Sequence, residues 1–146
     1  MTYSNLVDPF GTRDYGSLPP VEQVVRQTIE RDLGWIKVMA DAHRAELGFV
    51  MRSALAQSHA KGELLALAGG GGFCRYHLRR DGWYVIYEVV STVRGGGRAF
   101  LSHLGRPLRL KCPQGLPANE FYEHMGGTLA EMEPGRTRPL NVWEWH

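Results

Sequence analysis

The chain of 146 residues has 43% hydrophobic and 22% charged residues, close to the average of soluble globular domains. The formal net charge is +2, from 17 basic and 15 acidic side chains, an excess too small to indicate a nucleic-acid partner by itself. No apolar run approaches the roughly 20 residues that span a bilayer. These properties predict a soluble domain with no membrane partner.

The cysteines and the N-terminus favour a cytoplasmic protein. Cys74 and Cys112 lack the spacing of a metal site or a redox motif. The first residues have neither the basic start nor the apolar stretch of a secretory signal. Residues 1–20 contain glycines and prolines without periodicity, which predicts an N-terminal arm before a single domain of residues 21–146.

The first elements of that domain are predicted to be a strand and two helices. Apolar β-branched residues favour a short strand at about 24–29. Asp32 can cap a helix whose apolar positions share one face as far as Leu47, and Gly48 can end it. A second helix is expected over residues 49–61.

Three strands are predicted to follow. Residues 63–68 form an apolar strand that ends at the four glycines of 69–72. The strand over 73–80 alternates between polar and apolar residues, and the Asp-Gly pair at 81–82 is a strong signal for a tight turn. The β-rich residues 83–93 complete this antiparallel meander.

The remaining elements alternate between helices and strands. We expect a helix at 97–104, a strand at 107–112, a helix at 117–125, and strands at 128–133 and 140–145. The predicted order is β-α-α-β-β-β-α-β-α-β-β. An antiparallel meander that feeds a strand-to-helix turn indicates the α+β class.

The strand-to-helix turn carries the sharpest chemical signal. Glycines let backbone N–H groups converge there, and the dipole of the following helix favours a bound anion. The alternative is a glycine-rich turn with two solvated arginines. The residues of this turn are Arg94, Gly95, Gly96, Gly97, Arg98 and Ala99.

Arg94, Gly97 and Ala99 resemble the Arg/Gln-x-x-Gly-x-Gly/Ala segment of the GCN5-related N-acetyltransferases (GNAT), which binds the pyrophosphate of coenzyme A. The order of elements also resembles that family over about residues 24–146. The resemblance implies a mixed, mostly antiparallel central sheet flanked by helices, with acetyl-CoA as co-substrate and no metal.

A second resemblance lies in the segment from Asn119 through Tyr122 to Gly126, which is similar to the family helix that follows its splayed strand. It implies that Tyr122 protonates the departing CoA thiolate and that Asn119 contacts the cofactor arm. A phenol suits the first task because its O–H can donate to a developing sulfur anion. The alternative for Tyr122 is a core residue with its hydroxyl at the surface.

The resemblance also implies roles for the strand before the turn. Glu88 would take the proton of the acceptor amine, and the backbone of Glu88, Val89, Val90 and Ser91 would hold the thioester carbonyl. A carboxylate whose pKa is raised in an apolar setting is a reasonable base. The alternative for Glu88 is an ordinary solvated strand residue.

Together these residues imply an acyl-CoA-dependent N-acyltransferase, in which an amine attacks the thioester directly. Residues 42–67 also resemble phage Mom-type proteins, GNAT relatives that modify DNA adenine, which would make nucleic acid a partner of the face with Arg75 and Arg79. A non-catalytic CoA-binding module is a further alternative. Trp143 and Trp145 on an expected edge strand could mediate a homodimer or cap the core.

Overall fold

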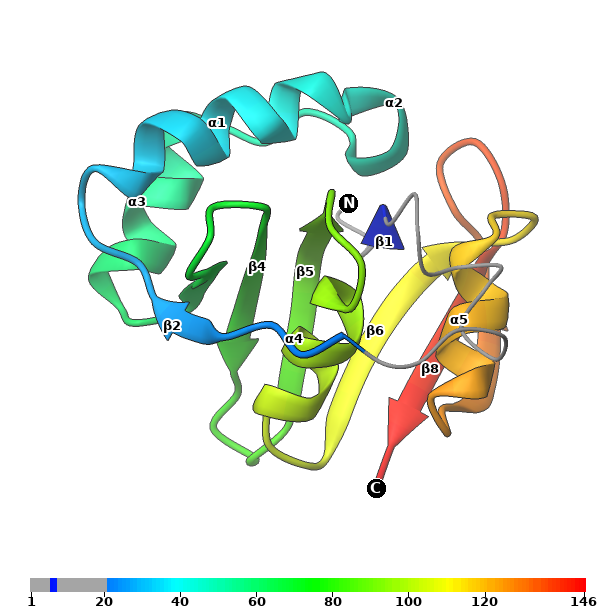
Figure 1. The fold of residues 1–146 in the computed structure, drawn as a ribbon. Coiled ribbons are helices and arrows are strands. Elements are labelled where there is room, and N and C mark those ends of the chain that lie inside the picture. Colours follow the sequence, from blue (N-terminus) through cyan, green and yellow to red (C-terminus); the bar gives the residue numbers. More distant parts are fainter. Residues whose placement is uncertain (1–5, 8–20) are drawn as a thin grey trace.

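The computed structural model describes residues 6–7 and 21–146 and is built on one mixed eight-stranded sheet (Figure 1). The strands lie in the order β2-β3-β4-β5-β6-β8-β7, and β1 pairs with β5 outside that path. Within the described residues, β1 and β6 run parallel to β5 and the other pairs are antiparallel. The predicted α+β class with a mostly antiparallel sheet is confirmed.

The observed elements follow the predicted order closely. Most of the predicted arm, residues 1–5 and 8–20, lies outside the described part of the chain. Strand β1 was not predicted. In chain order the elements are β1 (Leu6–Val7), β2 (Val25–Gln27), α1 (Asp32–Ala42), α2 (Arg44–Leu47), α3 (Arg52–Ala60), β3 (Leu64–Leu67), β4 (Gly72–Leu78), β5 (Tyr84–Ser91), α4 (Gly96–His103), β6 (Leu108–Pro113), α5 (Ala118–His124), β7 (Thr128–Glu133) and β8 (Leu140–Trp145).

The predicted single helix from Asp32 to Leu47 is wrong, because the chain forms α1 and α2 with a break at His43. The φ of His43 is −111° and its ψ is 27°, outside the helical region. A continuous helix would direct His43 and Arg44 toward the core, one turn beyond the buried Ala40. The break keeps the exposed Arg44 in solvent and still buries Leu47.

The sheet separates two apolar cores. Helices α4 and α5 cover one face, where Phe100 and Phe121 pack on strand residues such as Leu110. Helices α1 and α3 cover part of the other face, where Ile36 and Leu55 belong to a second, smaller core. The sheet is therefore buried on both sides near β3, β4 and β5, as expected for strands rich in apolar residues.

Strand β5 contains an irregularity that positions the site. Arg75 of β4 lies opposite Glu88 and the next residue, Tyr76, lies opposite Ile86, so Tyr87 is an extra, bulged residue. Beyond the bulge, β5 also leaves β6. The two strands pair only from Tyr84 to Ile86, although both continue further. We call this divergence the β5–β6 split.

Strand β8 occupies a different place from the one predicted. It lies between β6 and β7, and β7 is the strand at the end of the sheet. Trp143 and Trp145 are each only 5% exposed and belong to the core beneath α4 and α5. The prediction of an edge strand is therefore wrong, and of the two alternatives for the tryptophans the core position is the observed one.

Candidate functional site

The predicted functional residues lie on the elements that follow the two strands of the β5–β6 split or on β5 itself. The second half of β5 supplies Glu88 to Ser91, and the chain then enters α4 through Arg94 to Ala99, which we call the α4 turn. Helix α5, with Asn119 and Tyr122, follows β6 on the other side of the split. Parallel strands that diverge in this way leave backbone groups for which a ligand can compete.

The α4 turn is shaped by contacts within the chain. Gly95 has a φ of +85°, and a Cβ there would overlap the carbonyl oxygen of Val21. A Cβ on Gly96 would overlap Oγ of Ser91. Gln23 Nε2 also donates to the Arg94 carbonyl at 3.1 Å. Close packing by the chain itself is therefore sufficient to explain these two glycines.

The same turn retains donors for an anion. Among the described residues, the backbone N–H groups of Gly97 and Arg98 have no backbone acceptor, whereas Ala99 N–H donates to the Gly95 carbonyl at 3.0 Å. Arg98 is exposed in the first turn of α4. These N–H groups and the helix dipole favour a negatively charged ligand, and the phosphate site itself stays a prediction.

The edge of β5 next to the split is occupied by β1. Leu6 and Val7 pair in parallel with Val89 and Val90, the residues predicted to hold the thioester. Ser91 donates its hydroxyl to the Val93 carbonyl and so shapes the start of the turn. The chain thus supplies its own strand at the position predicted for the cofactor arm.

Glu88 is not a solvated residue, because it is only 1% exposed. Its carboxylate accepts two hydrogen bonds from Arg75, from Nε at 2.7 Å and from Nη2 at 2.8 Å. Burial raises the pKa of Glu88 although the neighbouring guanidinium of Arg75 opposes the shift. Arg75 also lies 4.7 Å from the centre of the Tyr87 ring. The carboxyl is therefore the buried partner of Arg75, and its role as a base stays a prediction.

Tyr122 lies on the opposite face of the sheet from Glu88. It is 0% exposed and belongs to the core under α4 and α5, so the alternative of a hydroxyl at the surface is wrong. Its ring centre lies 6.5 Å from that of Trp143 and 6.0 Å from that of Trp145. Glu88 shares its face of the sheet with Arg75. The two predicted catalytic residues therefore lie on opposite faces of the sheet.

Asn119 makes four hydrogen bonds within the chain. Its Nδ2 donates to the carbonyls of Pro113 at 2.9 Å and Leu116 at 3.0 Å. Its Oδ1 accepts from Asn141 Nδ2 at 3.0 Å and Trp143 Nε1 at 2.9 Å. The predicted contact between this side chain and the cofactor stays a prediction.

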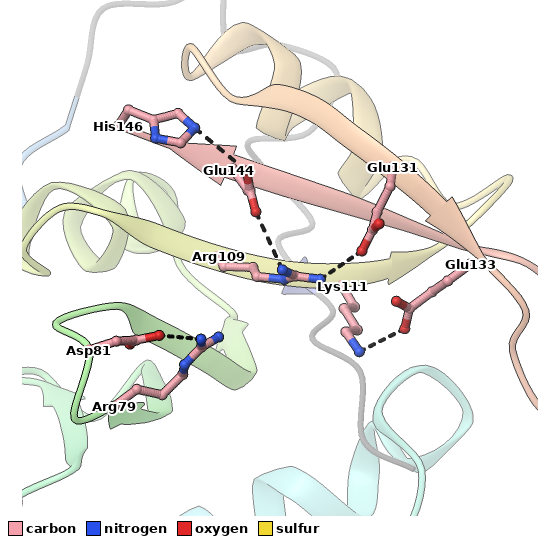
Figure 2. Close-up of polar contacts among 8 residues, drawn as sticks. All are labelled: Arg79, Asp81, Arg109, Lys111, Glu131, Glu133, Glu144 and His146. Atoms are coloured by element: carbon pink, nitrogen blue, oxygen red, sulfur yellow. Dashed lines mark hydrogen bonds and ion pairs between the residues drawn. The ribbon is translucent and has the colours of Figure 1, made fainter.

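The open face of β6, β7 and β8 carries basic residues that are paired with carboxylates (Figure 2). Arg109 contacts Glu131 at 2.8 Å and Glu144 at 3.5 Å. Lys111 and Arg79 likewise contact Glu133 and Asp81. The face predicted to meet nucleic acid is that of Arg75 and Arg79, and these two cations are also paired, with Glu88 and Asp81. Paired cations are poorer partners for DNA phosphates, which does not favour the predicted contact.

Neither cysteine suits a covalent mechanism. Cys74 and Cys112 are both buried, and burial raises the pKa of Cys112 to about 12, which keeps its thiol protonated. Within residues 6–7 and 21–146, no group of three or more His, Cys, Asp or Glu side chains could hold a metal ion. None of the helices described there is long and apolar enough to cross a membrane.

The functional residues missed by sequence reasoning depend on pairing between distant segments. The sequence analysis placed Arg75 on a strand face that could meet nucleic acid, and only the register across the bulge shows that it partners Glu88. Strand β1 gave no local signal, because two residues are too few for a periodic pattern.

The sequence matches no family model and no curated protein sequence. Solved structures match in fold. Ard1 from Thermoplasma volcanium aligns with a TM-score of 0.71 and 15% identity, over 86% of this chain and 97% of that one. An acetyltransferase of the GNAT family from Bacillus cereus ATCC 10987 aligns with a TM-score of 0.66 and 13% identity, over 86% and 97%. The chain has the GNAT fold.

A further GNAT-fold match is the N-acetylglutamate synthase from Neisseria gonorrhoeae, whose structure contains coenzyme A and N-acetyl-glutamate. It aligns with a TM-score of 0.67 and 15% identity over 88% of this chain, which spans only 36% of that protein. At such identities the matches establish the fold, and activity has to be argued from the site.

Proposed function

We propose that the chain is an N-acetyltransferase that uses acetyl-CoA or another small acyl-CoA as donor and an amine as acceptor. The observation that carries the proposal is the β5–β6 split in a GNAT fold, with a buried carboxyl on β5, a glycine-rich helix start after β5 and a buried tyrosine on the helix after β6. Each supplies one requirement of acyl transfer from a thioester.

The residues of the α4 turn fit the pyrophosphate of an acyl-CoA. The N–H groups of Gly97 and Arg98 have no backbone acceptor among the described residues, and the Arg98 side chain is exposed beside them. A pyrophosphate at this helix start would gain charge-assisted hydrogen bonds. The turn would thus fix one end of the donor.

In this proposal, the arm of the acyl-CoA donor and β1 compete for the same edge of β5. The backbone groups of Val89 and Val90 that face the split already pair with Leu6 and Val7. An acyl-CoA arm that binds the same groups has to displace β1, because each N–H and C=O group makes a limited number of hydrogen bonds. Strand β1 would lower the apparent affinity for the donor by the free energy of its pairing.

The reaction we propose is a direct transfer. The amine nitrogen forms a bond to the thioester carbonyl carbon, and the bond from that carbon to sulfur breaks. Glu88, directly or through a water, takes the proton of the amine, and Tyr122 gives its proton to the thiolate sulfur. A backbone N–H of β5 would stabilise the oxyanion. Base and acid lie on opposite faces of the sheet, so in this proposal they act on opposite sides of the one carbon that carries the amine nitrogen and the sulfur.

The first test is calorimetric titration of acetyl-CoA into the full chain. Arg98→Glu places a negative charge beside the proposed phosphate site, where an acidic residue is compatible with a helix start. We expect it to weaken binding about 10-fold or more, since hydrogen bonds to charged groups contribute about 1.5–3 kcal/mol.

Arg80→Glu is the matched control, because it makes the same charge change at an exposed position of the β4–β5 turn. This variant should bind like the wild type. A screen of amines with detection of free CoA thiol then tests turnover. Absence of acetyl-CoA binding by the wild-type chain and by a variant that releases β1 would overturn the proposed function.

A further inference from the structure

The side chain of Asn119 has no hydrogen-bonding capacity left for a ligand. A primary amide has two N–H donors and an oxygen with two lone pairs. The two donors go to the carbonyls of Pro113 and Leu116, and the oxygen accepts from Asn141 and Trp143. The four hydrogen-bonding partners belong to the end of β6, to the turn before α5 and, for two of them, to β8.

Two indoles of β8 hold the two ends of α5. Trp143 Nε1 donates to Asn119 Oδ1 near the start of the helix, at 2.9 Å. Trp145 Nε1 donates to the Met125 carbonyl just beyond its end, at 3.0 Å. The two tryptophans are two residues apart on one strand and therefore point to the same side of the sheet. They fix the helix along its length as well as against the sheet.

Tyr122 lies midway between these two anchors. It is three residues after Asn119 and three before Met125, so all three are on neighbouring parts of one helix face. Its ring contacts both indoles, at 6.5 Å from Trp143 and 6.0 Å from Trp145. A rotation or shift of α5 would move the phenol hydroxyl relative to the β5–β6 split.

We infer that Asn119 and Trp143 are positioning residues that set the place of the Tyr122 hydroxyl, and that Asn119 does so in place of contacting the cofactor. The inference rests on the proposed acyl transfer for its catalytic consequence. The hydrogen bond between the two side chains acts on Tyr122 through the helix, and neither side chain needs to touch donor or acceptor.

The test compares Trp143→Phe with Trp35→Phe. Both variants exchange an indole for a phenyl ring and remove one N–H hydrogen bond of 2.9 Å, but the bond of Trp35 goes to Asp32 at the start of α1. We expect Trp143→Phe to lower kcat about 10-fold or more, because small misplacements of a reacting group are costly. Its KM and Kd for acetyl-CoA should stay within about twofold of wild type. Trp35→Phe should keep the wild-type kcat.

Asn119→Asp is the second variant, because it keeps the size of the side chain and the acceptor for Trp143 but replaces both donors with oxygen. It should also lower kcat at an unchanged affinity for acetyl-CoA, because the start of α5 loses its hydrogen bonds to the Pro113 and Leu116 carbonyls. If instead it loses acetyl-CoA binding at an unchanged kcat, Asn119 is a cofactor ligand and the inference is overturned.

A ring signal of Tyr122 from tyrosine-labelled protein provides a readout that needs no turnover. The signal, assigned with Tyr122→Phe, should shift in Asn119→Asp, which leaves the indoles of Trp143 and Trp145 beside the ring, and should stay in place in Trp35→Phe. An unshifted signal in Asn119→Asp overturns the inference. If the wild type transfers no acyl group to any amine, the proposed function fails, and the ring signal still decides separately whether the pair holds Tyr122.

Discussion

The two helices that border the β5–β6 split are held in opposite ways. Helix α4 starts at glycines, and the described residues offer its N–H groups at Gly97 and Arg98 no backbone acceptor. Helix α5 is tied to its surroundings by the saturated amide of Asn119 and by the indole of Trp145. In the proposed function, α4 keeps N–H donors for a ligand, whereas the polar groups of α5 fix the position of the Tyr122 phenol.

Removing that phenol's hydroxyl should give the largest effect. Tyr122→Phe keeps the ring between Trp143 and Trp145 and removes only the proposed proton donor. We expect kcat to fall about 100-fold or more, within the range for general acid catalysis, at an unchanged Kd for acetyl-CoA. Steady-state kinetics and calorimetry would measure the two quantities. An unchanged kcat would show that the fixed helix serves packing alone.

Crowding the end of α5 tests how firmly it is held. A Cβ on Gly127 would lie 2.8 Å from the Trp145 ring and 2.9 Å from the Tyr122 carbonyl oxygen. Gly127→Ala should therefore lower the free energy of unfolding by about 1–3 kcal/mol, as overpacking does. Denaturant titration would measure the loss. Gly34→Ala, which adds the same atom to α1 with nothing within 4 Å, should be neutral or stabilising.

Weakening the pairing between β1 and β5 tests the proposed binding of the donor next to α4. Val7→Pro removes a backbone N–H from a strand of two residues and should weaken its pairing with Val89 and Val90. If one hydrogen bond of about 1 kcal/mol is lost, acetyl-CoA should bind about fivefold more tightly. Val7→Ala keeps the backbone and should bind like the wild type. Weaker binding by the proline variant would mean that β1 supports the donor site.

The smallest expected change concerns the pH dependence of Glu88. A base has to be ionised, so kcat/KM should rise with pH through a pKa above the ordinary 4.5, because burial raises it. Arg75 opposes that shift, and Arg75→Gln should move the rising limb to higher pH. Glu88→Gln should remove the limb. If the pH profile of Glu88→Gln shows the same rising limb as that of the wild type, Glu88 is not the base.

The sequence predicted those parts of the fold that depend on local patterns. Alternation in β4, the Asp-Gly turn and the glycines before α4 are readable because each is set by neighbouring residues. For the site residues, the sequence predicted the strand or helix on which each lies, but it did not predict which distant side chain each contacts. Arg75 meets Glu88 across 13 residues of chain and Asn119 meets Trp143 across 24. Such contacts depend on register and packing, which no local pattern encodes.

The bulge at Tyr87 separates the proposed acid from the proposed base. In an unbroken strand Ile86 and Glu88 would point to the same side, since side chains alternate. The extra residue reverses the phase, so that Ile86 enters the core with Tyr122 and Glu88 faces Arg75 on the other side. If Tyr87 were instead paired regularly with β4, the carboxylate of Glu88 would turn toward the core that contains Tyr122, and the guanidinium of Arg75 would lose its partner. One inserted residue thus gives the sheet two chemically distinct sides.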